Sequence, residues 1–303
     1  MPELPDVTIY VEALERHVLD TRLEDVRLGS PFVLRSVQPP VSDVAGRRVT
    51  GVRRLGKRIV LALDLDVFVI VHLMIAGRLR WRTRGTPLPG RRGLAALDFE
   101  TGTVLFTEEG TTHRAGLWLV RGEEALASHD PGGVDPCTAR LEAFRDALVR
   151  ERHTLKRTLT DPHVFAGIGN AYSDEILHAA RLSPLQLTTN LDADEIGRLY
   201  DATRWTLETW TARLRDEVGD GFPEKVTAFR DGMAVHGRYR QPCPACGSPV
   251  QRIRYAENEV NYCATCQTGG KVLADRALSR LLREDWPRSL DEWEGRMGAG
   301  SQQ

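Results

Sequence analysis

Long apolar runs are missing from this sequence of 303 residues. The longest, Val67 to Leu73, is far shorter than the roughly 20 residues of a membrane-spanning helix, and it contains His72. The start, MPELPD, lacks the basic residues and the apolar core of a signal peptide. With 41% hydrophobic and 27% charged residues, the chain is neither disordered, collagen-like nor a coiled-coil rod. We therefore expect a cytoplasmic protein that makes no contact with membranes.

The chain also has almost no net charge. The 41 Lys and Arg residues and the 42 Asp and Glu residues leave a formal charge of −1, whereas domains that bind nucleic acid are often basic. The charges are unevenly placed, however, because arginines are dense over 78–92 and 238–254 and acidic residues gather after Arg283. Such segregation allows a positive groove on a chain of little overall charge.

Strand patterns dominate the first 130 residues. Short segments rich in β-branched and aromatic residues alternate there with Gly, Pro and Asp turns. Near the start, apolar residues recur at helical spacing from Val7 to Leu19, which predicts an amphipathic helix that begins after Pro5 with Asp6 as its N-cap. The segments that we expect to form strands are 58–65, 67–75, 94–101 and 116–122.

Helical spacing replaces the strand patterns after a turn-rich linker at 130–136. Short strands around cysteines follow over 237–270, and the tail contains one more helical stretch within 274–294. The helices that we expect between the linker and the cysteines are 138–152, 171–180 and 193–216. The chain is therefore predicted to be a multidomain α+β protein.

Cysteine is scarce, and four of the five cysteines form two CxxC pairs. Cys243 and Cys246 are separated by sixteen residues from Cys263 and Cys266, which is the spacing of a four-cysteine zinc ribbon. Each CxxC turn presents two thiolates to one point, and two turns complete a tetrahedron with no open position. We therefore predict one structural Zn²⁺. Cys137 stands alone and is interpreted as a free thiol.

The first six residues, MPELPD, suggest a nucleophile. Methionine before proline is normally removed, which would expose Pro2 as a secondary amine. An α-amino group has a pKa near 8, so part of it is unprotonated at neutral pH and can form an iminium with a sugar C1′ or an aldehyde. Glu3 follows directly and could move protons. Taken alone, these residues favour the simpler interpretation that Pro2 only begins an extended segment.

Four separated motifs together resemble the formamidopyrimidine-DNA glycosylase/endonuclease VIII family. They are MPELPD at the terminus, Gly-Lys-Arg at 56–58, Gly-Ile-Gly-Asn-Ala-Tyr-Ser-Asp-Glu at 167–175, and the four-cysteine ribbon, and they occur in family order over residues 1 to about 270. The resemblance implies an N-terminal catalytic β-sandwich with an N-terminal helix (1–130), a helix–two-turn–helix domain (131–236), a zinc-ribbon finger (237–270) and a partly helical tail (271–303).

The resemblance also assigns the catalytic residues Pro2, Glu3 and Lys57. Pro2 would attack C1′ of a damaged nucleotide, expel the base and hold the sugar as a Schiff base before β/δ-elimination. Glu3 would handle the protons, and Lys57 would contact phosphate near the lesion. The implied partner is damaged DNA, bound by a monomer.

The resemblance further points to DNA-binding residues. Asn170, in the glycine-containing turn, would hold a phosphate, and Glu175 would begin the following helix. His72 and Lys156 are further phosphate candidates, although a lone histidine or lysine is usually structural or solvated.

Several aligned positions differ from relatives that excise formamidopyrimidines. Those relatives insert Met, Arg and Phe into the duplex, where this chain has Ile75, His113 and Ala115, and they grip phosphate with a finger arginine, where it has Asn258. Alanine cannot separate bases as phenylalanine does, and asparagine carries no charge. We therefore predict a specificity different from 8-oxoguanine. Two alternatives are an abasic-site lyase without base excision and a non-catalytic protein that binds DNA damage.

Overall fold

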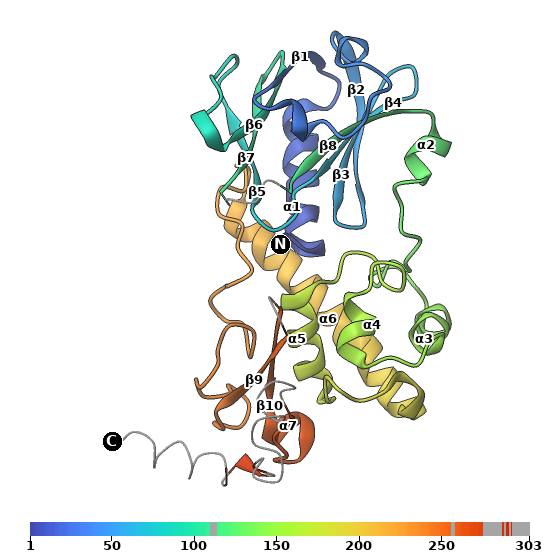
Figure 1. The fold of residues 1–303 in the computed structure, drawn as a ribbon, viewed down its shortest axis with the longest axis vertical. Helices are drawn as coiled ribbons and strands as arrows, with labels where there is room; N and C mark the ends of the chain where they lie inside the picture. Colours follow the sequence, from blue (N-terminus) through green and yellow to red (C-terminus); the bar gives the residue numbers. More distant parts are fainter. Residues whose placement is uncertain (110–113, 256–257, 275–286, 288, 291, 293–303) are drawn as a thin grey trace. The chain divides into compact units, whose positions relative to one another are not determined.

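The structure is a computed structural model of the chain, and it describes residues 1–109, 114–255, 258–274, 287, 289–290 and 292 (Figure 1). Two compact units are present. Unit 1 comprises residues 1–133 and 208–228, and unit 2 comprises residues 134–207 and 229 onward. No helix in these described ranges combines the length and the hydropathy needed to cross a bilayer.

Unit 1 contains eight antiparallel strands among its described residues, hydrogen-bonded in the order β5-β7-β6-β1-β2-β3-β4-β8. The halves β5-β7-β6-β1 and β2-β3-β4-β8 meet at a short pairing in which Arg22 lies opposite Arg48 and Leu23 opposite Arg47. The strands are β1 (Arg22–Leu28), β2 (Arg47–Leu55), β3 (Arg58–Leu63), β4 (Val67–His72), β5 (Gly77–Arg82), β6 (Gly93–Phe99), β7 (Gly102–Glu108) and β8 (Gly116–Arg121).

One hydrophobic core joins both halves of this sheet to helix α1 (Leu4–Val18). Val7, Tyr10 and Leu14 of the helix are fully buried against side chains from both halves, such as Ile59 and Phe106. Figure 1 shows the two halves on either side of α1. The predicted β-sandwich with an N-terminal helix is therefore confirmed, since the helical spacing of these apolar residues matches the face that they bury.

Unit 2 begins with short helices. The expected helix over 138–152 is shorter, α3 (Leu141–Val149), and it is followed by α4 (Leu155–Thr160), which the sequence pattern did not predict. The other expected helices are present as α5 (Asn170–Ala180) and α6 (Ala193–Val218), and α6 contributes residues to both units. A short helix, α2 (Glu123–Ala127), precedes them in unit 1. This arrangement confirms a helical domain after the strands.

The cysteine-containing segment forms a small ribbon in unit 2. Strands β9 (Val250–Tyr255) and β10 (Asn258–Cys263) pair antiparallel, and α7 (Ala264–Thr268) follows. Most of the expected tail helix within 274–294 lies outside the described residues. The contact pattern places one boundary at Gly133/Val134, groups the ribbon with the helices, and assigns 208–228 to unit 1, so the four-part division with its boundaries stays a prediction.

Candidate active site, DNA interface and metal centre

Helix α1 begins earlier than its sequence suggests. Glu3, not Asp6, is the N-cap residue, and the N–H of Val7 donates to its carbonyl oxygen at 2.9 Å. Pro5 lies within the first turn, where a missing N–H breaks no helical hydrogen bond. Asp6 instead caps from the third helical position, because its Oδ2 accepts from the Glu3 N–H at 2.9 Å. This geometry buries Pro2 and Glu3 and fixes the start of the chain against the sheet.

Lys57 lies at the tip of the β2–β3 hairpin. Leu55 pairs with Arg58, so Gly56 and Lys57 form a two-residue turn, and Gly56 takes φ +57° at its first position, as a type II′ turn requires. Burial lowers the pKa of the Lys57 ammonium, and the Glu3 carboxylate opposes that shift. The hairpin therefore places Lys57 within the electrostatic reach of Glu3.

The terminal amine lies in the same electrostatic environment. Burial is the main cause that lowers the pKa of the Met1 ammonium, and Glu3 raises it while Arg78 and Lys57 lower it. The structure thus brings together the chain start, Glu3 and Lys57, the three catalytic positions predicted from the resemblance. An amine in this environment loses its proton more readily than one in water.

His72, at the end of β4, joins this cluster as a neutral ring. Burial first, and then the charges of Arg58 and Lys57, lower its pKa to about 4. The Met74 N–H donates to Nδ1 of His72 at 3.3 Å, so the ring proton resides on Nε2. His72 can therefore offer a phosphate an N–H donor at neutral pH but not a positive charge.

The loop between β4 and β5 carries an apolar tip. Ile75 is 58% exposed there, unusually for its residue type, and Met74 before it adopts φ +50°. Ala115 is only 2% exposed, and the N–H groups of Arg114 and Ala115 donate to Oε1 of Glu108 at 3.2 and 3.3 Å. His113 lies outside the described residues. Of the described positions that align with duplex-inserting side chains of relatives, Ile75 is exposed to solvent and Ala115 is buried.

Asn170 begins helix α5 after a tight turn. Gly167 adopts φ +91°, a conformation that glycine takes without steric cost, and Gly169 is the N-cap residue of the helix. Asn170 is partly exposed, and its backbone carbonyl oxygen accepts from Nζ of Lys156 at 2.7 Å. The turn thus presents Asn170 at a helix N-terminus, where free N–H groups and the helix dipole favour an anion.

Lys156 is 8% exposed and has a second internal partner. Its Nζ lies 2.5 Å from Oδ1 of Asp174, which is itself 1% exposed. Two of the three ammonium protons are therefore directed inward, toward the turn that holds Asn170 and toward helix α5. A direct contact between Lys156 and phosphate stays a prediction.

Two carboxylates of α5 bind neighbouring segments. The resemblance implied that Glu175 begins the helix. It lies in the middle of the helix instead, because the helix starts at Asn170. Its carboxylate accepts from the N–H groups of Ala234, Val235 and His236 at 2.6, 2.9 and 2.9 Å, while burial raises its pKa. Glu175 therefore holds the segment that leads into the ribbon.

Asp174 holds the ribbon itself. Its Oδ2 accepts from Nδ1 of His236 at 2.8 Å and from the backbone N–H of Asn261, in β10, at 3.1 Å. Sequence reasoning missed Asp174, His236 and Asn261 as site-supporting residues. Asp174 lies in the motif at 167–175 and could have been suspected, but no local pattern marks the other two.

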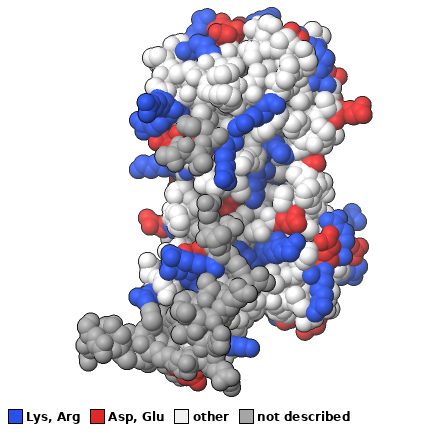
Figure 2. Space-filling view, viewed as in Figure 1, with Lys and Arg blue, Asp and Glu red and all other residues white. Residues whose placement is uncertain are grey.

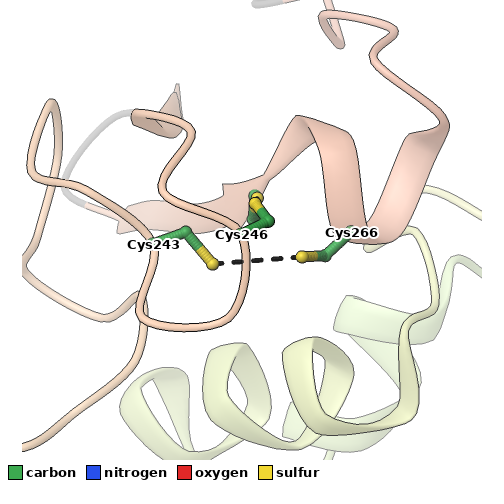
Figure 3. Close-up of side chains that lie close together, drawn as sticks. Cys243, Cys246 and Cys266 are labelled. Atoms are coloured by element: carbon green, nitrogen blue, oxygen red, sulfur yellow. Dashed lines mark hydrogen bonds between the residues drawn. The ribbon is translucent and has the colours of Figure 1, made fainter.

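The four predicted cysteines form one cluster. Their Sγ atoms all lie within 4.8 Å of one another, and they come from the turn at 243–246, the end of β10 and helix α7. Figure 3 shows Cys243, Cys246 and Cys266 converging, with 3.9 Å between the Sγ atoms of Cys243 and Cys266. Cys246 and Cys263 are 3.4 Å apart. Zinc–sulfur bonds of about 2.3 Å in a tetrahedron require sulfurs about 3.8 Å apart, so the cluster fits Zn²⁺.

The thiols of the cluster differ in how readily they lose a proton. Burial raises the pKa of Cys263 well above its usual range and that of Cys266 to about 11. Desolvation acts the same way on Cys246, but hydrogen bonds with Ser248 outweigh it and lower its pKa to about 6. A divalent cation would let four such crowded sulfurs exist as thiolates together.

The predicted DNA-binding residue Asn258 is the first residue of β10, where it pairs with Tyr255 of β9.

Basic side chains are prominent on the molecular face drawn in Figure 2, where Lys and Arg are blue. Several arginines of unit 1 are nevertheless paired with acids: Arg82 and Arg80 contact Glu224 at 2.7 and 3.6 Å, and Arg92 contacts Glu109 at 3.1 Å. The arginine-rich stretch 78–92 is thus partly neutralised by internal ion pairs.

Comparison with known proteins shows which family has this combination of elements. Residues 1–112 match the model of the formamidopyrimidine-DNA glycosylase N-terminal domain, and residues 133–214 match that of the helix–two-turn–helix domain of the same enzymes. A strand sandwich headed by a buried terminus, a helical domain with a glycine turn and a four-cysteine ribbon define a DNA repair glycosylase. The chain belongs to the formamidopyrimidine-DNA glycosylase family.

Individual relatives cover most of the chain. The formamidopyrimidine-DNA glycosylase of Heliobacterium modesticaldum is 31% identical over 289 residues, covering 88% of this chain and 100% of its own length. The MutM protein of Thermus thermophilus is 32% identical with a TM-score of 0.71, over 88% of this chain and 98% of that one. A Mycobacterium tuberculosis protein described as formamidopyrimidine-DNA glycosylase-like is 44% identical over 151 residues, 50% of this chain and 94% of its own.

A more distant structure shares the fold. The Lactococcus lactis enzyme, crystallised in complex with DNA containing an abasic site, has a TM-score of 0.76 at 22% identity, over 88% of this chain and 99% of that one.

Proposed function

We propose that this chain is a bifunctional DNA glycosylase and abasic-site lyase whose nucleophile is the amine of Pro2. The observation that carries the proposal is the buried start of the chain beside Glu3 and Lys57, where burial lowers the pKa of the terminal amine. Removal of Met1 would turn the Pro2 nitrogen into a secondary amine in that same environment. An uncharged amine has the free lone pair that nucleophilic attack needs.

The chemistry runs through an iminium. The Pro2 nitrogen attacks C1′ and loses its proton, and the bond between C1′ and the damaged base breaks, so that the base leaves with the bonding electrons and takes up a proton. The sugar ring opens as its oxygen is protonated, which leaves a C1′=N iminium. Loss of a C2′ proton then expels the 3′-phosphate. Glu3, 3% exposed at the helix N-terminus, is the residue that we assign to these proton transfers.

DNA is the partner that these groups require. Lys57 supplies a cation next to Glu3, and His72 supplies a neutral Nε2–H donor beside it. In unit 2, the Asn170 turn offers a helix N-terminus for a phosphate, with Lys156 holding the turn. The Lactococcus lactis relative was crystallised on DNA with an abasic site, which supports the same partner.

We also propose that the damaged base which this enzyme excises is not 8-oxoguanine. The enzyme must fill the gap left by an extruded nucleotide, and Ile75, 58% exposed at the tip of the β4–β5 loop, is the apolar side chain that we assign to it. Ala115 is 2% exposed and too short to enter the duplex. An abasic-site lyase is the second candidate, favoured by the same observation, because a missing base leaves less to recognise.

Zn²⁺ completes the proposal as a structural ion. The thiolates of Cys243, Cys246, Cys263 and Cys266 would hold it and leave no open position for substrate. We further propose that the protein acts as a monomer on bacterial DNA in the cytoplasm, and that Asn258 contributes an uncharged phosphate contact from the finger.

Trapping with borohydride tests the nucleophile. Borohydride reduces an iminium to a stable amine, so the chain should form a covalent complex with abasic-site DNA. A variant that keeps one extra residue before Pro2 has an amide there and should form none. Glu3→Gln should slow trapping at least tenfold, and Glu15→Gln, an exposed position on the same helix, should not.

A panel of oligonucleotides with defined lesions separates the candidates. Release of a damaged base together with a covalent complex supports the glycosylase. A complex formed only on abasic DNA supports the lyase, and binding without any complex leaves a protein that recognises damage without turnover. Equal trapping with the extended terminus would remove Pro2 from its assigned role.

A further inference from the structure

A histidine of helix α5 lies against one of the four clustered cysteines. Nε2 of His178 is 3.2 Å from Sγ of Cys243, and Cys243 is 2% exposed. His178 stands in the last turn of the helix, and neither the CxxC spacing nor the Gly-Ile-Gly-Asn motif includes it. The contact therefore joins the ribbon to the helical part of unit 2.

The direction of this hydrogen bond follows from the metal. A thiolate bound to Zn²⁺ has no proton to give, so a contact at this distance forms only if the ring donates its N–H. We propose that His178 is a positioning residue that donates an Nε2–H···S hydrogen bond to the metal-bound Cys243 thiolate. This inference rests on the proposed occupancy of the site by zinc.

The four sulfurs argue that His178 is not itself a ligand. They lie within 4.8 Å of one another and already supply the four ligands of a tetrahedral ion. A donor from outside the ligand set withdraws electron density from its thiolate and fixes the side chain in the binding rotamer. Loss of such an outer contact typically weakens metal affinity by about 10- to 100-fold.

Two further contacts attach the ribbon to α5 and the turn after it. Gln267 accepts from the N–H of the ligand Cys263 at 2.8 Å and donates to the carbonyl of Leu182 at 2.9 Å. Asp174 accepts from the Asn261 N–H at 3.1 Å. His178 is the member of this set that touches a sulfur, so it links the metal site to the helix that begins at Asn170. Eight residues separate the two positions, about 12 Å along a helix.

Zinc affinity of matched variants tests the proposal. His178→Phe keeps a flat ring and removes the donor, His178→Gln keeps an N–H donor, and His163→Phe changes an exposed histidine elsewhere in unit 2. Competition with a chromophoric chelator should show zinc bound at least tenfold more weakly by His178→Phe than by wild type. His178→Gln should recover most of the loss, and His163→Phe should match wild type.

Cobalt substitution adds a spectroscopic readout. Removing a hydrogen bond from a thiolate raises the energy of its electrons, so the sulfur-to-cobalt charge-transfer band of His178→Phe should shift to longer wavelength. A purely structural role for the ring would change affinity and leave the band in place. An unshifted band would overturn the proposal whether or not zinc affinity falls, and so would zinc affinity within twofold of wild type.

The unmodified chain provides a test that does not depend on the folding of a variant. In protein loaded with ¹¹³Cd and labelled with ¹⁵N on histidine, a scalar coupling between the metal and the Nε2 proton of His178 is expected across the hydrogen bond. Absence of that coupling in a cadmium-loaded protein overturns the role of His178. Absence of any metal from the purified chain instead overturns the proposed zinc site, so the two failures are distinguishable.

Discussion

Buried charge gathers around the Asp174 carboxylate in unit 2. It has no exposed side-chain surface, and its two oxygens accept from Lys156, His236 and Asn261. Asp174→Asn keeps the size of the side chain but removes the negative charge. In this variant the Lys156 ammonium has no carboxylate partner at position 174. It stays in the interior, because only 10% of the Lys156 side chain is exposed.

The expected loss of stability follows from that uncompensated charge. Breaking a buried ion pair by removing one partner typically costs about 3–5 kcal/mol, because the remaining charge is desolvated without compensation. The distance of 2.5 Å between Nζ and Oδ1 and the additional donors from His236 and Asn261 place Asp174→Asn within that range. The Asn170 turn, which shares Lys156, should loosen as well, so affinity for abasic DNA should also fall.

Urea unfolding followed by circular dichroism, with hydrogen exchange of the α5 amides, measures this loss. The control is Asp146→Asn, the same substitution in an exposed pair where Arg145 lies at 2.9 Å. Exposed pairs contribute about 0–1 kcal/mol, so the control should unfold nearly as wild type does. A loss below about 1 kcal/mol for Asp174→Asn, with α5 exchange unchanged, would refute the assignment of Asp174 as the anchor between α5 and the ribbon.

Other residues give shorter predictions. The pKa of His72 is about 4 in the fold and near 6.5 in an unfolded chain, so the unfolded chain binds more protons between these values. The free energy of unfolding of the wild type should therefore fall as the pH drops from 6.5 to 4, by up to roughly 3 kcal/mol relative to His72→Gln. Urea midpoints of both proteins at each pH measure this difference. If the two proteins lose stability equally over this pH range, the buried neutral ring is contradicted. Borohydride trapping should rise with pH through a midpoint below pH 8, since burial lowers the pKa of the amine at the start of the chain, and a midpoint above 8 would oppose this reasoning. Ile75→Ser should weaken binding to abasic DNA by about 1–2 kcal/mol in a fluorescence titration if the side chain enters the duplex, and Leu65→Ser, also exposed in a turn of unit 1, should not.

Local signals in the sequence predicted most of the fold. Segments rich in β-branched and aromatic residues located β3, β4, β6 and β8 but missed β1, β2, β5 and β7, and helical spacing located α1, α5 and α6. The CxxC spacing predicted a cluster whose sulfurs lie within 4.8 Å of one another. These features depend on residues a few positions apart, so their periodicity is visible without tertiary contacts. The start of α1 was wrong because Pro5 was interpreted as a barrier, whereas a proline in the first turn breaks no hydrogen bond.

The supporting residues of unit 2 depend on distant contacts. Asp174 meets Asn261 across 87 residues, and Glu175 binds backbone groups 59 to 61 residues later. His178 meets Cys243 across 65 residues. No short pattern connects such positions, and a carboxylate that accepts three backbone N–H groups looks, in sequence, like any helical glutamate. Tertiary packing alone reveals which acids are interior anchors.

Ile75 presents its apolar surface without a sulfur atom. Aligned relatives are expected to carry methionine at this position, and oxidation converts that thioether into a polar sulfoxide that no longer suits a hydrophobic contact. A saturated hydrocarbon is inert to peroxide. The Ile75 side chain, 58% exposed, therefore keeps its apolar character under oxidants that can convert the thioether of the neighbouring Met74 to a sulfoxide.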